Sequence, residues 1–148
     1  MKKYVVLVFA LLLFSFCLRG CGSETQGEKK ISDYQWRLET ISDLEGNILV
    51  TNSEQPKLAD TQCDMRLYFN GDNTFLLSDK TNKQEWEGTY TLKKLDKLST
   101  SYQLNLLFEN IETEYIGVYG IRTYEDKTEI PSITFQTEHE ILSFLASE

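Results

Sequence analysis

The chain has 148 residues, of which 26% are charged and 12% aromatic, and its formal net charge at pH 7 is −8. An acidic chain repels phosphate groups, so this composition argues against nucleic acid as a partner and, for the chain as a whole, against anionic lipid headgroups. Two of the three cysteines lie close to the N-terminus, which leaves no pair for a disulfide framework in the rest of the chain.

The first 20 residues have the layout of an export signal. Lys2 and Lys3 precede an apolar run over residues 4–16, which ends at Cys17. The run is shorter than the roughly 20 apolar residues that a permanent transmembrane helix needs. We therefore expect residues 1–20 to be a signal peptide that is removed during export.

The residues that close this segment resemble the lipobox of bacterial lipoproteins. Leu18-Arg19-Gly20-Cys21 places a branched apolar residue and a small residue before a cysteine, although the family usually has a small or apolar residue where this chain has Arg19. The resemblance implies that Cys21 carries the lipid and becomes the first residue of the mature, extracytoplasmic protein. Cys17 is the rival acceptor, and an ordinary secretory signal that releases a soluble product is the alternative.

The mature chain is predicted to be a tether followed by one domain. Residues 21–30 contain no large apolar side chain after the cysteine and are typical of a flexible tether, and residues 31–148 have the usual size of a single domain. The mature chain keeps 12 basic and all 23 acidic residues, a net charge of −11. This charge either serves solubility alone or attracts a cationic partner.

Hydrophobic residues in the domain alternate with polar ones, as in half-buried strands. Leu142, Phe144 and Ala146 favour a strand over a short helix at residues 140–146. Residues 115–124 are β-branched and aromatic throughout, which predicts a strand covered on both faces. The other predicted strands occupy residues 34–39, 64–69, 75–77, 85–92, 102–109 and 133–135.

Turn residues separate these segments at residues 45–47, 70–73, 80–83 and 125–127. Two longer connections, residues 52–62 and 93–99, are expected to form a binding rim. About eight short strands must protect their edges, so we predict an all-β antiparallel meander that closes into a barrel or folds as a sandwich.

The order of these motifs resembles the small lipocalin-like domains of bacterial lipoproteins. The matching pieces are Trp36-x-Leu38, Leu67-x-Phe69-Asn70-Gly71-Asp72-x-Thr74-Phe75, Trp86-x-Gly88-x-Tyr90-x-Leu92 and Tyr102-x-Leu104-x-Leu106. True lipocalins begin with Gly-x-Trp, whereas this chain has Tyr34 in place of the glycine. The resemblance implies a lipocalin-like barrel, and architecture transfers more safely than activity.

Motifs for catalysis are missing from the sequence: it has no Gly-rich phosphate loop, His-Glu-x-x-His, Gly-x-Ser-x-Gly or Cys-x-x-Cys. We therefore expect no enzymatic activity, no cofactor and no metal. Cys63 is interpreted as a small apolar core residue and His139 as an exposed turn residue. The acidic pairs Glu85 with Glu87 and Glu112 with Glu114 are expected on solvated faces.

Aromatic residues at alternating positions either fill the barrel or line the mouth of a pocket. Arg122 lies in the most apolar segment, where an inward guanidinium would anchor a ligand or the fold. The candidate ligand-binding residues are Trp36, Trp86, Tyr90, Tyr119 and Arg122.

Two functions are consistent with these features. The first is a membrane-anchored, non-catalytic binding module for a small apolar ligand or a partner protein. The second follows from a resemblance to lantibiotic immunity lipoproteins, which are similarly short, lipid-anchored and β-rich and intercept a cationic peptide at the membrane. A structural role in the envelope is a third possibility.

Overall fold

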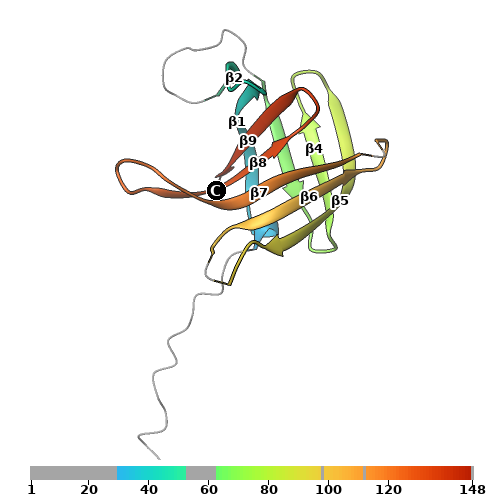
Figure 1. Cartoon of the computed structure of the whole chain (residues 1–148). Helices are drawn as coiled ribbons and strands as arrows, with labels where there is room; N and C mark the ends of the chain where they lie inside the picture. The colour runs from blue at the N-terminus through green and yellow to red at the C-terminus, as the bar shows by residue number, and fades with distance from the viewer. Residues whose placement is uncertain (1–29, 53–62, 98, 112, 148) are drawn as a thin grey trace, which may run out of the picture.

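The computed structural model describes residues 30–52, 63–97, 99–111 and 113–147. The predicted signal peptide, Cys21 and the tether up to residue 29 lie outside the described residues. Apart from one 3-10 turn, the regular elements are β-strands (Figure 1). They are η1 (Ile31–Asp33), β1 (Gln35–Asp43), β2 (Ile48–Thr51), β3 (Met65–Phe69), β4 (Thr74–Asp79), β5 (Gln84–Lys94), β6 (Tyr102–Phe108), β7 (Glu114–Thr123), β8 (Glu129–Gln136) and β9 (Glu140–Ser147).

The strands form a closed antiparallel barrel. Each strand from β3 to β8 pairs with the next one along the chain, and β1 pairs with both β3 and β9. Eight strands therefore close on themselves, which gives every barrel strand two neighbours. The ninth strand, β2, pairs with the part of β1 that extends past β3. The predicted all-β barrel is confirmed, and the final segment is a strand as expected.

Alternate residues of each strand point inward and fill the barrel. Figure 1 shows the strands curling around one interior, and the side chains on the inner face form a single hydrophobic cluster. Two edge-to-face ring pairs, Phe69 with Tyr90 and Phe75 with Phe108, lie 4.7 and 4.9 Å apart. The largest fully buried side chains are Trp36, Phe75, Phe135, Phe144, Leu67, Leu104, Leu106 and Ile133.

Turn η1 closes one end of the barrel, which we call the lower end because it lies lowest in Figure 1. Ile31 of this turn is buried in the core cluster, and its carbonyl accepts a hydrogen bond from the Trp36 indole N–H at 3.0 Å. The turns β3–β4, β5–β6 and β7–β8 lie at the same end, because the strands alternate in direction. The turn was not predicted, since three residues carry no periodicity.

At the opposite, upper end, β1 leaves the barrel together with β2. The register between β1 and β9 shifts between Leu38 and Thr40, so Glu39 forms a bulge. Because of the bulge, the next inward-facing side chain of β1 after Leu38 is Ile41, three residues later, which is also buried. The sequence analysis identified the turn at residues 45–47 but missed β2, whose four residues show no clear alternation.

The prediction that residues 115–124 are covered on both faces is wrong. Tyr115, Gly117 and Tyr119 of β7 face the core, whereas Ile116 and Val118 are exposed on the outside. In a barrel of this size only the inner face of a strand is covered, and no layer packs on the outside of β7 among the described residues. β-branched composition shows that a segment is a strand, but it does not show which face is covered.

Candidate functional site

The five predicted ligand-binding residues do not converge on one site. Trp36 is fully buried, and its N–H is bonded to the backbone of η1, so it belongs to the core. Trp86 is half-buried at the upper part of the core, where β5 pairs with Leu77 of β4. Tyr90 and Tyr119 share a groove at the lower end, and Arg122 lies on the outer face.

The lower groove is bordered by η1, the β3–β4 turn and the lower ends of β5, β6 and β7. Its volume is about 660 Å³, within the range of small-ligand pockets. The rings of Tyr102 and Tyr119 stack in it with centroids 5.7 Å apart and planes inclined by 25°. The Tyr90 hydroxyl donates to the Asn70 carbonyl oxygen at 3.1 Å, which directs its polar end to the turn. Burial and the nearby Asp72 carboxylate raise the pKa of the Tyr90 phenol, so it remains protonated at neutral pH.

Arg122 is not the inward anchor that was proposed from the sequence. It has the same phase along β7 as the exposed Ile116 and Val118, so it belongs to the outer face. Its guanidinium pairs with the carboxylate of Glu39 at the β1 bulge. A charge within an apolar segment is tolerated here because alternate residues of the segment face solvent.

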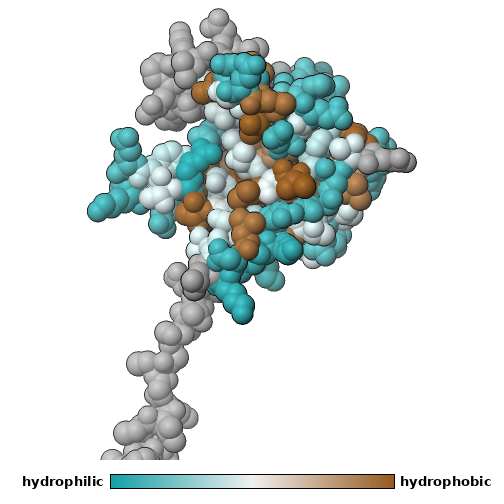
Figure 2. Space-filling view, in the orientation of Figure 1, coloured by the Kyte–Doolittle hydropathy of each residue, from teal (hydrophilic) through white to brown (hydrophobic). Residues whose placement is uncertain are grey.

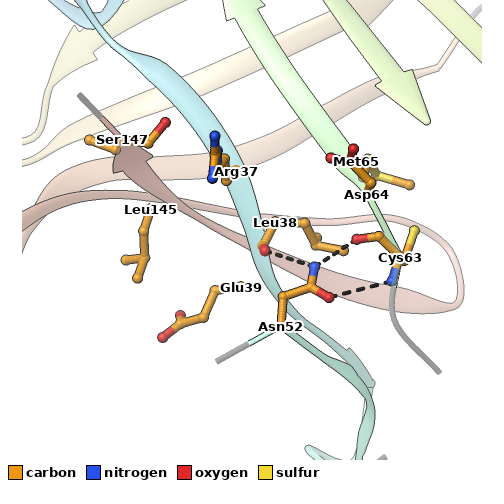
Figure 3. A pocket seen from close by; sticks show the side chains of 10 residues that line it. Arg37, Leu38, Glu39, Asn52, Cys63, Asp64, Met65, Leu145 and Ser147 are labelled. Carbon is orange, nitrogen blue, oxygen red and sulfur yellow. Dashed lines mark hydrogen bonds between the residues drawn. The ribbon is translucent and has the colours of Figure 1, made fainter. Parts of the chain in front are cut away.

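The upper cleft lies outside the barrel wall, where β1 passes between β2 and β3 (Figure 3). Its volume is about 390 Å³. The side-chain amide of Asn52 donates to the carbonyl oxygens of Leu38 and Cys63, at 3.0 and 2.6 Å. It thereby links β1 to the segment that immediately precedes β3. The cleft is lined by Arg37, Leu38, Glu39, Asn52, Cys63, Asp64, Met65, Leu145, Ala146 and Ser147.

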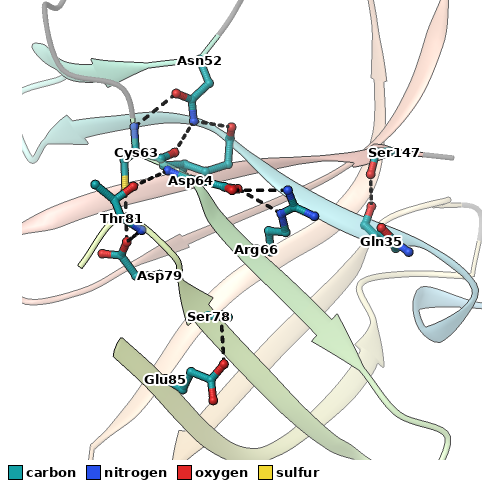
Figure 4. Close-up of polar contacts among 11 residues, drawn as sticks. Gln35, Asn52, Cys63, Asp64, Arg66, Ser78, Asp79, Thr81, Glu85 and Ser147 are labelled. Carbon is teal, nitrogen blue, oxygen red and sulfur yellow. Dashed lines mark hydrogen bonds and ion pairs between the residues drawn. The ribbon is translucent and has the colours of Figure 1, made fainter. Parts of the chain in front are cut away.

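Polar groups beside this cleft are occupied by structural contacts (Figure 4). The buried Asp79 carboxylate accepts the backbone N–H groups of Thr81 and Asn82 and the side-chain amide of Asn82. Cys63 Sγ lies 3.9 Å from Asp79 Oδ1. Burial and then the negative charge of Asp79 raise the pKa of the Cys63 thiol, so it is held as a thiol rather than as a nucleophilic thiolate.

The acidic pairs identified in the sequence and the histidine are exposed where the structure describes them. Glu85, Glu87, Glu114 and His139 all lie on the surface, as expected, and Glu112 lies outside the described residues. In the described parts of the chain, no group of three His, Cys, Asp or Glu residues could hold a metal ion. Every buried side-chain nitrogen and oxygen in those parts has a hydrogen-bond partner.

The two long connections do not form one rim. Asn52 and Cys63, which flank residues 53–62, lie at the upper end, whereas residues 93–97 and Ser99 of the second connection lie at the lower end. The shared rim predicted from the sequence is therefore wrong. Residues 53–62 themselves lie outside the described residues.

An apolar patch lies on the outer face of β6 and β7, and Figure 2 shows it among polar surroundings. We define the outer patch as Leu107, Ile116 and Val118, whose exposed fractions are 48%, 57% and 45%. Leu107 pairs with Glu114, so it is a diagonal neighbour of Ile116, and Val118 lies two residues further along the same face of β7. The sequence contained these residues, but their exposure was not predicted.

Comparison of the chain with models of protein families, with curated proteins and with solved structures finds no match. No helix within the described residues has the length and apolar character to cross a membrane.

Proposed function

We propose that this protein is a membrane-anchored, extracytoplasmic binding module that performs no chemistry and holds a partner protein or peptide on the outer wall of its barrel. The observation that carries the proposal is the outer patch on a barrel whose interior is filled by its own side chains. A filled barrel offers little room inside for the small apolar ligand of the first hypothesis. Contiguous exposed apolar side chains mark contact surfaces more often than isolated ones do.

The anchor in this proposal is a lipid on Cys21, within Leu18-Arg19-Gly20-Cys21. Two acyl chains, at ~0.8 kcal/mol per buried methylene, would hold the protein far more firmly than one. The domain would then stand outside the cytoplasmic membrane at the end of residues 22–29. Replacement of Cys21 by Ser is expected to shift the protein from the membrane fraction to the soluble fraction or to leave an uncleaved precursor, and unchanged partitioning into detergent would contradict the anchor.

A cationic peptide is the second candidate partner, and the border of the outer patch favours it. The exposed carboxylates of Glu87, Glu109 and Glu114 lie at the upper border of the patch, since Glu114 pairs with Leu107 and the Glu109 amide donates to the Glu87 carbonyl. An amphipathic cationic peptide could place its apolar face on the patch and its charges on these acids. The net charge of the mature chain, −11 by the count given above, adds long-range attraction.

The test uses a synthetic amphipathic peptide of leucine and lysine as the probe, with affinity measured by calorimetry. Replacement of Ile116 and Val118 together by Thr keeps the β-branched shape and removes the apolar surface. We expect affinity to fall by about tenfold or more, because residues that dominate an interface cost about 2 kcal/mol or more when their contacts are removed, and about 1.4 kcal/mol is tenfold in affinity.

The matched control replaces Leu49 of β2, which is 43% exposed, by Thr. This variant should bind as the parent chain does. Replacement of Glu87 and Glu114 by Gln should instead reduce the dependence of affinity on salt. Equal affinity of the patch variant and the control variant would refute the outer patch as the binding surface.

A further inference from the structure

The β5–β6 connection concentrates positive charge in an otherwise acidic protein. Lys93, Lys94 and Lys97 lie within five residues, with Asp96 as the only acid among them. All three lysines are exposed, and so is Leu95, whose exposed fraction is 53%. We call residues 93–97 the basic loop. Its composition, lysines around an exposed leucine, is complementary to a surface that is anionic on the outside and apolar beneath.

The basic loop is at the lower end of the barrel, where the chain also enters. Lys30 and Leu92 line the same groove, which places the start of the described domain beside the start of the loop (Figure 1). Lys30 follows Cys21 by nine positions in the sequence, and at ~3.3–3.6 Å per position this stretch reaches at most about 32 Å. A lipid on Cys21 would keep the lower end within this distance of the membrane.

Hydrogen bonds link the basic loop to the residues that precede β6. The Asp96 carboxylate accepts the Ser99 N–H at 2.7 Å, the Ser99 hydroxyl accepts the Ser101 N–H at 2.9 Å, and the Leu95 N–H donates to the Ser101 carbonyl at 3.2 Å. These bonds restrict the backbone at Leu95 and Asp96, which lowers the entropy cost of placing Leu95 against a surface.

Two carboxylates near the basic loop accept hydrogen bonds from their own turns: Asp33 accepts the Lys30 N–H, and Asp72 accepts the Thr74 N–H and hydroxyl. The lower end as a whole has nearly equal numbers of bases and acids, because the β7–β8 turn adds Glu125, Asp126 and Glu129. The positive excess is therefore confined to the basic loop, where three lysines face one acid. At the upper end, by contrast, the exposed acids include Glu45, Asp64 and Glu138.

We propose that the basic loop docks on anionic phospholipid headgroups and so fixes the orientation of the domain, with the lower end on the membrane and the β1–β2 hairpin pointing away. This proposal rests on the lipid anchor of the proposed function. The net negative charge of the domain does not oppose it, because the anchor supplies the attachment and only the charge distribution decides the orientation. The surface field decays over ~10 Å at 0.1 M salt, so it acts mainly on groups close to the membrane, and docking through the basic loop keeps the acids of the upper end outside its range.

The test supplies the tether artificially, so that it does not depend on natural lipidation. All strands and the core lie within residues 31–147, so a chain of residues 22–148 with an N-terminal hexahistidine tag retains the whole barrel. It is bound to vesicles that carry a nickel-chelating lipid in either phosphatidylcholine alone or a mixture with phosphatidylglycerol. A fluorophore is attached to Cys in place of Thr100 at the lower end or Glu45 at the upper end, with Cys63 replaced by Ala, and a headgroup-linked quencher reports proximity.

We expect quenching at position 100, but not at position 45, on vesicles that contain phosphatidylglycerol. Replacement of Lys93, Lys94 and Lys97 by Gln should shift the docked-to-undocked ratio by about fivefold per lysine, the equivalent of ~1 kcal/mol each. Replacement of Lys80 and Lys83, two exposed lysines of the β4–β5 turn, is the matched control and should change nothing.

Equal quenching at both positions, or the same quenching on phosphatidylcholine alone, would overturn the docking proposal. Neither result bears on Cys21, because the tag provides the attachment. Conversely, a Cys21→Ser variant that stays in the membrane fraction would refute the proposed lipid anchor, and the result of the docking measurement would remain valid.

Discussion

The inner and outer faces of the barrel use the same apolar residue types in opposite environments. Ile133 of β8 is fully buried, whereas Ile116 of the adjacent strand β7 is 57% exposed. Both lie in regular antiparallel ladders. The difference comes from the parity of each position along its strand, since a closed barrel covers only the side chains that point inward. Stability should therefore depend on the inner face, and the outer face should be free to serve recognition.

Removal of the Trp36 side chain should have the largest effect. Its ring is fully buried and its N–H holds η1 over the lower end, so Trp36→Ala is expected to cost about 3–5 kcal/mol of unfolding free energy. Chemical denaturation monitored by circular dichroism measures this loss. Trp36→Phe keeps most of the ring but leaves the Ile31 carbonyl unpaired, and should cost about 1–3 kcal/mol. A loss below 1 kcal/mol for Trp36→Ala would show that the inner face does not dominate stability.

A methyl group added at Gly88 should have the next largest effect. Gly88 pairs with Phe75 and with Phe108, and the two rings meet over it. A Cβ at this position would lie 2.2 Å from the Leu107 carbonyl oxygen and 2.7 Å from the Phe75 ring. Because the first of these atoms is backbone, Gly88→Ala is expected to destabilise the barrel by about 1–3 kcal/mol or more.

Gly71 provides the control for this substitution. It lies in the β3–β4 turn, and a Cβ there would meet no atom within 4 Å. Gly71→Ala should leave the denaturation midpoint unchanged or raise it slightly, because it restricts the unfolded chain. Equal losses for the two variants would mean that intrinsic strand or turn propensity, rather than crowding inside the barrel, sets the cost.

Much of the fold was predictable because alternation and turn chemistry are local signals. Leu67 with Phe69, and Leu104 with Leu106, occupy alternate positions of strands that were predicted to be half-buried, and the structure buries all four. The closure of the barrel followed from the need to protect strand edges. The strand β2 and the turn η1 were missed because each is too short to show a periodic pattern, although their contacts, the hairpin pairing with β1 and the bond from Trp36 to Ile31, are local in the sequence.

The candidate site was less predictable, because exposure depends on which elements lack a covering layer. Tyr90 and Tyr119 were selected as aromatic residues and do share a groove, but selection by residue type also included Trp36, which is core. Arg122 was chosen as the arginine that would serve as an anchor if it pointed inward, and its partner Glu39 is 83 residues away in the sequence. No local pattern contains such a pair.

Lowering the pH should destabilise the turns of the barrel more than its strands. Hydrogen bonds from the Asn47 side chain and backbone lower the pKa of Asp43, and bonds from Thr74 lower that of Asp72. A carboxylate with a lower pKa in the folded than in the unfolded state, about 3.9, stabilises the fold above that pH and loses this contribution as the pH falls through the folded value. We therefore expect the melting temperature to drop below about pH 4, and Asp43→Ala to reduce that drop. Replacement of Glu45, an exposed residue of the same turn, by Gln is the control. An equal change in the acid-induced drop of melting temperature in both variants would contradict the role of Asp43.

Substitution on the outer patch should have the smallest effect on stability, and it tests the contrast between the two faces most directly. Ile116→Ala removes little buried surface, so its cost should stay within about 0.5 kcal/mol, the usual range for surface positions, with up to ~1 kcal/mol if strand propensity contributes. Ile133→Ala removes the same atoms from the core and should cost about 2–5 kcal/mol. The identical chemical change cancels differences in side-chain transfer, so the gap between the two measurements reports burial alone. A gap below 1 kcal/mol would mean that Ile116 is covered in solution, for instance by a second copy of the chain, and the concentration dependence of the melting temperature would then reveal the association.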